Sequence, residues 1–284
     1  MRQVIQLMRP LLLLALCIGV ARADTGKIRK IGPLEMGLVT ESMGVAHEKS
    51  FWLAWRIRRD NGWHTYWKFP GDVGVPPTVL WDLPAGLQAG ELVFPPPRKI
   101  MMAQVGAHGH TGETLFLCKF EPKTPFRVGE TIRIQGQFSW LTCSQTCLPG
   151  YADLSIELKV RKSVSPDPMW RPRFDLFREQ QPVAPPKDWE PSASSHSDGY
   201  VLSIPSLPGA QPSEVRFFGE GRMIRSNAPQ ILRRGKQGWE LLLTQSPWAR
   251  KGLTHLSGLL YRREGWGTEE NPSFYRLNLP LSGN

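Results

Sequence analysis

Hydrophobic and polar residues alternate along several short segments of the chain. In residues 51–58, FWLAWRIR, every odd-numbered position is large and apolar. In residues 152–160, ADLSIELKV, the even-numbered positions are apolar and the odd-numbered ones are polar. Side chains of a β-strand point alternately to its two faces, so this period of two predicts strands that bury one face. Asp-Asn-Gly at 60–62 adds a turn signal before a return strand at 63–67.

The wider pattern predicts an all-β protein with two immunoglobulin-like antiparallel β-sandwich domains. Further strand-like runs occupy residues 114–120 and 131–140, and similar patterns resume from Tyr200. The stretch 69–97 is rich in proline and glycine, which excludes long helices there. Many short strands separated by turns are typical of a sandwich.

The segment between the two strand-rich regions predicts a linker. Residues 162–197 hold seven prolines. One short helix is expected inside it at 173–181, where Phe174 and Phe177 share a face. The expected organisation is a first domain at 24–161, the linker at 162–197, and a smaller β-domain at 198–284.

The first 23 residues have the features of a secretory signal peptide. Arg2 and Arg9 precede the apolar run 11–20, and Ala-Arg-Ala at 21–23 is a small-x-small cleavage site. The apolar run is too short to span a bilayer. We therefore expect an exported, soluble, periplasmic protein without stable membrane insertion. Its scattered positive charges, +10 overall, indicate a solvated surface and do not predict nucleic-acid binding.

Three cysteines remain after cleavage, and two of them lie close together. Cys143 and Cys147 occupy the tight connection between two predicted strands, within WLTCSQTCLPG at 140–150. An odd count suggests one pair and one leftover. Cys118 lies in an apolar strand and is expected to be free and buried. The pair could be a structural staple, worth roughly 2 kcal/mol for so short a loop, a metal site, or an exchangeable redox disulfide.

Other chemical motifs are few. Nucleotide-binding, zinc-protease and nucleophile-elbow signatures are absent, and no cofactor is expected. One cluster, KIMMAQVGAHGHTGE at 99–113, carries methionine and histidine side chains of the kind copper prefers. His108 and His110, with Cys143 and Cys147, are therefore an alternative metal-ligand set. The corresponding alternative function is a non-enzymatic periplasmic copper-handling protein, connected with copper tolerance.

Three stretches together resemble a known family. They are GWHTYWKFPGDVGVPPTVLWDLPAGLQAGELVFPPPRKI at 62–100, HGHTGETLF at 108–116 and WLTCSQTCLPGYADLSIEL at 140–158. They are similar to the periplasmic N-terminal domain of the thiol:disulfide interchange protein DsbD, and closest in style to its ScsB (suppressor of copper sensitivity) branch. The resemblance extends over roughly residues 34–282, more weakly in the second domain.

The resemblance implies a thiol–disulfide exchange module, a protein-disulfide reductase if active. Cys143 and Cys147 would be the exchanging pair, and periplasmic thioredoxin-fold proteins would be its partners. Cys147 would form the partner-facing mixed disulfide. The family's cap loop would correspond to residues 104–111, with His108, Gly109 and His110 at the place where aromatic residues surround a glycine. Shielding by these histidines would be looser and sensitive to pH.

One departure from the family concerns the electron supply. Full-length members continue into a transmembrane electron carrier and a thioredoxin-like domain, and the sequence ends at Asn284 without either. Two alternatives follow: a module fed by a separate membrane electron carrier, or a domain that has lost its supply.

Overall fold

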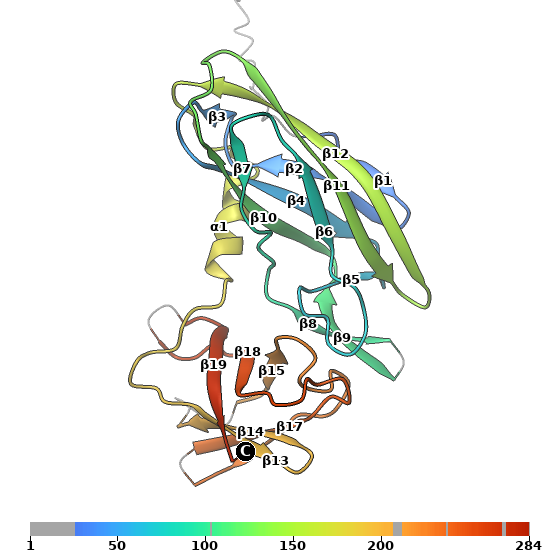
Figure 1. The fold of residues 1–284 in the computed structure, drawn as a ribbon, viewed down its shortest axis with the longest axis vertical. Helices are drawn as coiled ribbons and strands as arrows, with labels where there is room; N and C mark the ends of the chain where they lie inside the picture. The colour runs from blue at the N-terminus through green and yellow to red at the C-terminus, as the bar shows by residue number, and fades with distance from the viewer. Residues whose placement is uncertain (1–25, 103, 207–211, 237, 269–270, 284) are drawn as a thin grey trace, which may run out of the picture.

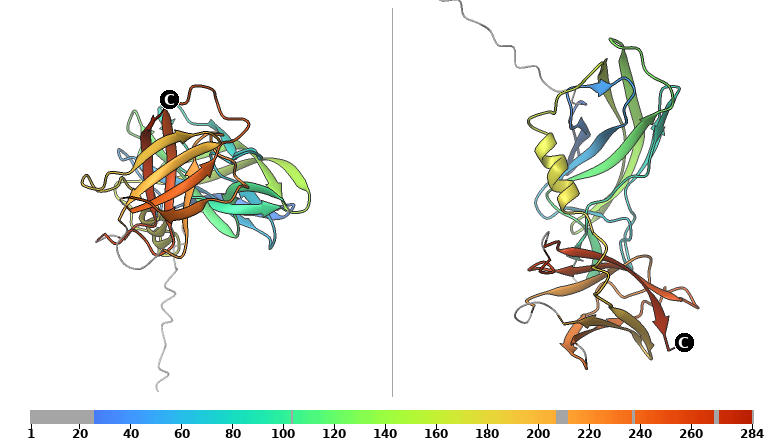
Figure 2. Two further views of the ribbon diagram at one scale, coloured as in Figure 1. Left: turned by 90° about the horizontal axis from the view of Figure 1, so that it is seen from below. Right: turned by 90° about the vertical axis from the view of Figure 1, so that its left-hand side faces the viewer.

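The computed structural model describes residues 26–102, 104–206, 212–236, 238–268 and 271–283 (Figure 1). The signal peptide expected at 1–23 lies outside them. The described chain is built of strands with one helix (Figures 1 and 2). The expected all-β class, with a single short helix between two strand-rich units, is confirmed.

Two sheets form the N-terminal unit. The first has five strands in the order β1 (Arg29–Ile31), β2 (Leu34–Thr40), β4 (Phe51–Arg59), β10 (Glu113–Pro122) and β7 (Leu87–Ala89). The second follows the order β3 (Val45–Ala46), β12 (Cys147–Arg161), β11 (Thr131–Cys143), β5 (His64–Tyr66), β9 (Val105–His110) and β8 (Arg98–Met102). In addition, β6 (Thr78–Asp82) pairs with β11.

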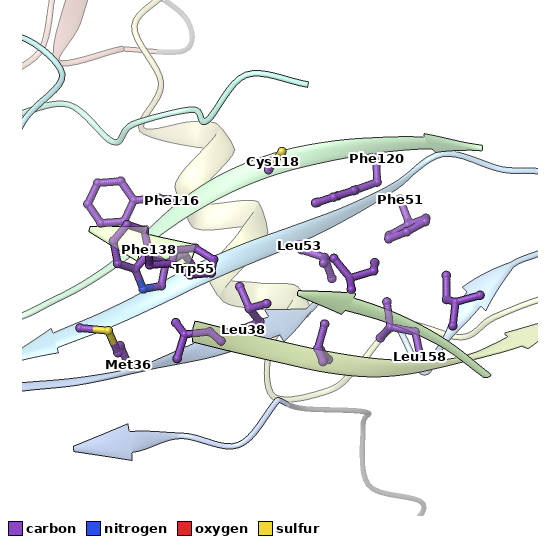
Figure 3. Packing of buried hydrophobic residues seen from close by; sticks show 14 of the residues in the cluster. Met36, Leu38, Phe51, Leu53, Trp55, Phe116, Cys118, Phe120, Phe138 and Leu158 are labelled. Carbon is purple, nitrogen blue, oxygen red and sulfur yellow. The ribbon is translucent and has the colours of Figure 1, made fainter. Parts of the chain in front are cut away.

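The alternation read from the sequence sets the core between these sheets. Trp55 is 1% exposed, and its ring lies 4.6 Å from that of Phe138 and 5.8 Å from that of Phe116 (Figure 3). The Trp55 ring also lies 6.2 Å from that of Trp140, so the aromatic core extends to the last residues of β11. The core therefore supports the hairpin that bears the cysteine pair.

The helix α1 (Arg171–Glu179) covers the outer face of the five-stranded sheet (Figure 1). The turn that leads into the helix is fixed by Asp167, whose Oδ1 accepts hydrogen bonds from the N–H groups of Met169 and Trp170. Phe174 and Phe177 are buried, as their spacing predicted, in a cluster with apolar residues of β2, β4 and β10. Burying each phenylalanine contributes roughly 1.5–3 kcal/mol.

The C-terminal unit is a seven-stranded sheet with its own core. The strand order is β15 (Val215–Gly219), β18 (His255–Arg262), β19 (Phe274–Ser282), β13 (Ser192–His196), β14 (Gly199–Pro205), β17 (Gly238–Thr244) and β16 (Ile231–Arg234). Strand β13 lies at the end of the segment expected to be a linker. Its sequence SASSH buries only Ala193, so hydrophobic alternation could not reveal it.

The two units are in direct contact. Trp67 of the N-terminal unit is buried with Phe218 of β15 and Leu259 of β18. Figures 1 and 2 show β8 and β9 at the end of the N-terminal sandwich that faces the C-terminal unit. This end of the sandwich also holds the cysteine pair.

Candidate functional site

The cysteine pair closes the long hairpin of β11 and β12. Cys143 is the last residue of β11 and pairs with Cys147, the first residue of β12. Their Cα atoms are 4.1 Å apart, and the two sulfurs form a disulfide. Cys118 is free and buried. The pairing predicted from the cysteine count and from the strand position of Cys118 is confirmed.

The two sulfurs have different surroundings. Cys143 is fully buried, whereas Cys147 is exposed at the hairpin tip. A nucleophile or an incoming disulfide needs access to a sulfur along the S–S axis. Cys147 therefore offers the accessible sulfur of the pair, and Cys143 offers the enclosed one.

Tyr66 of β5 is the main polar contact of Cys143. Its hydroxyl donates a hydrogen bond to the Cys143 Sγ at 3.0 Å, and both residues are buried. Burial raises the pKa of Tyr66, so the hydroxyl stays protonated as a donor. A hydrogen bond of this kind favours a thiolate over a thiol, which would ease departure of Cys143 when the disulfide is reduced.

Two segments cover Cys143, and we call them the covering segments. One is the β8–β9 hairpin, which brings Met102 and Ala107 against Cys143 and Tyr66. The other is residues 71–74, which contributes Val73. Gly74 has φ +103°, and a Cβ there would lie 2.2 Å from the Tyr66 ring, so only glycine allows this close approach.

Strand register decides which imidazole lies on the disulfide face. Cys143 pairs with His64, and Tyr66 pairs with Gly109. Directly paired residues share a face of the sheet, and so do residues two apart. His64, Tyr66, Ala107 and Gly109 are therefore on the face of Cys143. The His64 ring packs edge-on against Tyr66 at 5.3 Å, and burial lowers the pKa of this imidazole.

The expectation that His108 and His110 shield the pair is corrected by this register. Both belong to strand β9 and are buried, and both point to the opposite face from Cys143. The His108 ring contacts Phe218 at 5.0 Å, and the His110 ring contacts Phe116 at 5.5 Å. Of the three residues assigned to the cap loop, only Gly109 lies on the disulfide face.

Burial also removes the expected pH sensitivity near the imidazole range. It lowers the pKa of His108 to about 4 and holds that of His110 well below its usual value. Both imidazoles are neutral at pH 7, so neither supplies a cation to a thiolate. Tyr66 and His64 were not predicted from the sequence as neighbours of the disulfide. A short strand such as His-Thr-Tyr carries no signal for which other strands it will pair with. The period-two spacing of the two residues was the available signal.

The alternative metal site is not assembled. Among the residues that the structure describes, no group of three or more His, Cys, Asp or Glu side chains is placed to hold a metal ion. His108 and His110 face away from the disulfide, for the register reason given above. The proposed set of His108, His110, Cys143 and Cys147 is therefore not brought together.

Cys118 has the environment of a structural residue. Its thiol donates to the Gly90 carbonyl oxygen at 3.3 Å, and burial raises its pKa to about 11. A thiol with such a pKa carries almost no thiolate at neutral pH and is a poor nucleophile. This leaves Cys143 and Cys147 as the cysteines available for chemistry in the described chain.

The burial of His108 predicts acid-sensitive stability. The pKa of His108 is about 4 in the folded state and about 6.5 in the unfolded state. Its contribution to stability is therefore fully present above pH 6.5 and is lost as the pH falls from 6.5 towards 4. Between pH 7.5 and 5, His108 should contribute a loss of about 2 kcal/mol in the free energy of unfolding. Urea unfolding across this range measures it.

The matched variant for that experiment is His108→Asn. Asparagine can still donate to the Phe69 carbonyl oxygen, which His108 Nδ1 contacts at 3.2 Å, but it does not titrate. The pH dependence should become shallower by about 2 kcal/mol. The same substitution at the exposed His196 is the control for the change of residue type. Equal slopes for the wild type and His108→Asn would contradict the prediction.

Comparison with known proteins finds a family model that matches the part of the chain that holds the site. Residues 39–158 match the family described as the thiol:disulfide interchange protein DsbD, N-terminal. This matched segment contains both cysteines, Tyr66 and both covering segments.

Residues 39–158 thus resemble the N-terminal domain of DsbD.

The matched segment lies within a larger two-unit fold. The crystal structure of the N-terminal periplasmic domain of ScsB from Proteus mirabilis is similar to the chain, with a TM-score of 0.63 and 13% sequence identity. The similarity covers 92% of this chain and 98% of that one, so it includes the C-terminal unit. No curated protein matches. In the described part of the chain, no helix has the length and apolar character needed to cross a membrane.

Proposed function

We propose that this protein is a periplasmic thiol:disulfide interchange protein that passes electrons through Cys143 and Cys147 to thioredoxin-fold partners. The observation that carries the proposal is the asymmetric disulfide at the hairpin tip of a DsbD N-terminal domain, with Cys147 exposed and Cys143 buried under Tyr66. A structural staple does not require one accessible sulfur, whereas exchange does.

The proposed reaction has two steps. The Cys147 thiolate attacks one sulfur of an oxidised partner's disulfide, which forms a mixed disulfide and releases one partner thiolate. Cys143 then attacks the Cys147 sulfur, so the Cys143–Cys147 disulfide forms and the second partner thiolate leaves. Two electrons pass to the partner. The protons lost by Cys143 and Cys147 balance those taken up by the two partner thiolates.

The proposed location and electron source follow from the same chemistry. Disulfides form and persist in oxidising compartments such as the periplasm, which agrees with the secretory signal peptide expected at 1–23. A separate membrane electron carrier would reduce the pair again after each transfer. Exported protein should begin at Asp24, which N-terminal sequencing of the periplasmic product would test.

The reduction potential of the pair tests the proposed function. Equilibration with dithiothreitol or glutathione buffers, followed by alkylation and mass spectrometry, should give a potential above about −300 mV, the region of exchangeable disulfides. The reduced protein should also transfer its electrons to an oxidised thioredoxin-fold protein. A potential below that limit together with no transfer would identify the disulfide as a structural staple.

A further inference from the structure

Strand β9 contacts the disulfide with one face and the C-terminal unit with the other. Ala107 packs against Cys143 and Tyr66. On the opposite face, the Cβ position of Gly106 lies against the backbone of Ser226 and Asn227, and the ring of His108 packs on Phe218 of the C-terminal unit. Because successive side chains of a strand alternate, a movement of β9 away from the C-terminal unit also moves Ala107 relative to Cys143. The cover of the disulfide is thus mechanically joined to the second unit.

Ser226 is the polar centre of this junction. It is 4% exposed, and its hydroxyl donates to the Gly106 carbonyl oxygen at 2.6 Å. The Ser226 Oγ also accepts a hydrogen bond from the Asp72 N–H at 3.1 Å, and the Ser226 N–H donates to Asp72 Oδ2 at 2.8 Å. Ser246, also buried, donates to Asp72 Oδ1 at 2.6 Å. One serine therefore binds the β8–β9 hairpin and residues 71–74, the two covering segments, at once.

Glycines make this close approach possible on both covering segments. A Cβ at Gly71 would lie 2.5 Å from the Ser226 Cβ, and a Cβ at Gly106 would lie 2.6 Å from the Asn227 Cα. Real Cβ atoms do not come so close without a shift of the backbone. The contact is therefore fitted to the backbone of residues 226 and 227 and is not a loose touch between two surfaces.

We propose that Ser226 is a positioning residue for the exchange reaction, holding both covering segments over Cys143 from the C-terminal unit. This rests on the proposed function, since it assigns a role in that same reaction. Cys143 must attack the Cys147 sulfur in the second step, and its cover sets how often Cys143 is open to other reagents. The C-terminal unit thereby limits the access of other reagents to Cys143, which remains able to attack the Cys147 sulfur within the same molecule.

Alkylation of the three cysteines tests the proposal in the full chain. The reduced protein is treated with iodoacetamide, and each site is followed by peptide mass spectrometry. Cys147 serves as the exposed reference and Cys118 as the reporter of core opening. Cys143 reports on the cover, and its rate is measured in a Cys147→Ser background so that alkylation of one cysteine does not alter the other.

Ser226→Ala removes the hydroxyl that binds both covering segments. Loss of these buried hydrogen bonds should raise the alkylation rate of Cys143 about tenfold by favouring local opening. The rates of Cys147 and Cys118 should not change. Ser246→Ala removes the contacts to Asp72 and to the Trp248 N–H but none to the β8–β9 hairpin, so it should give a smaller increase at Cys143. Ser257→Ala is the matched control, because its hydroxyl donates to Asn278 within the C-terminal unit and does not contact the covering segments.

Two outcomes would overturn the proposal. One is an unchanged Cys143 rate in Ser226→Ala. The other is an equal rise at Cys143 and Cys118, which would show that the serine only stabilises the fold. Should Ser226→Ala not fold, Gly106→Ala separates the same surfaces through its added methyl and should give the same selective rise. Because no partner protein or potential enters this measurement, its failure is distinct from failure of the proposed function.

Discussion

Cys143→Ser should trap a mixed disulfide with an oxidised thioredoxin-fold partner, and Cys147→Ser should not. In Cys143→Ser the remaining Cys147 is exposed at the hairpin tip and can attack a partner disulfide, but the serine cannot resolve the product. In Cys147→Ser the remaining Cys143 is fully buried beneath Tyr66 and the covering segments. Exchange requires the attacking sulfur to reach the two sulfurs of the partner's disulfide. The yield of trapped complex should therefore be at least about tenfold higher for Cys143→Ser than for Cys147→Ser.

Non-reducing electrophoresis and mass spectrometry measure the trapped complex. Cys118→Ala is the matched control, because Cys118 is buried in another part of the sandwich and should not affect trapping in either background. Equal yields from both single variants would refute the assignment of Cys147 as the partner-facing sulfur. If neither variant trapped a partner while the reduced wild type bound copper tightly, the copper-handling function would replace exchange.

Trp55→Ala should cause the largest loss of stability in the N-terminal unit. Trp55 is 1% exposed and contacts Phe116, Phe138 and Trp140 at the centre of the core. Replacing a buried tryptophan by alanine removes its transfer free energy and leaves a cavity, at a cost of about 3–5 kcal/mol. Denaturant unfolding of the oxidised protein, monitored by circular dichroism, measures this change.

Trp248→Ala provides the control for the same chemical change at the surface. Trp248 is 64% exposed, so its removal should alter the free energy of unfolding by less than about 0.5 kcal/mol. A loss at Trp55 no greater than that at Trp248 would show that the aromatic cluster does not support the sandwich. The Trp55→Ala variant should also loosen β11, because Trp140 of that strand rests on the Trp55 ring.

The C-terminal unit lies against the strand that covers Cys143, although it carries no cysteine itself. Residues 198–282 hold no cysteine, so the unit supplies no thiol of its own to the exchange. The structure places Ser226 and Phe218 of this unit directly against the strand that covers Cys143. Removing the unit would expose Trp67, which is buried between the two units. The unit is thus part of the surroundings of the site.

Local sequence pattern was enough to predict the strongly alternating strands, the helix and the cysteine pair. Alternation in residues 51–58 and 152–160 encodes a buried face locally, and the Phe174–Phe177 spacing encodes a helix face. The disulfide followed from the short hairpin connection and from the odd cysteine count. These features depend on neighbours within a few residues, so local periodicity and spacing are enough to predict them.

The side chains that surround Cys143 are set by long-range strand pairing, which the local sequence pattern does not encode. The pairing of Cys143 with His64 and of Tyr66 with Gly109 joins strands far apart in the sequence. Because strand side chains have a period of two, a shift of one residue exchanges the two faces completely. That is why Ala107 faces Cys143 while the flanking His108 packs on Phe218. The contact of Ser226 with Gly106 spans 120 residues and has no local signature at all.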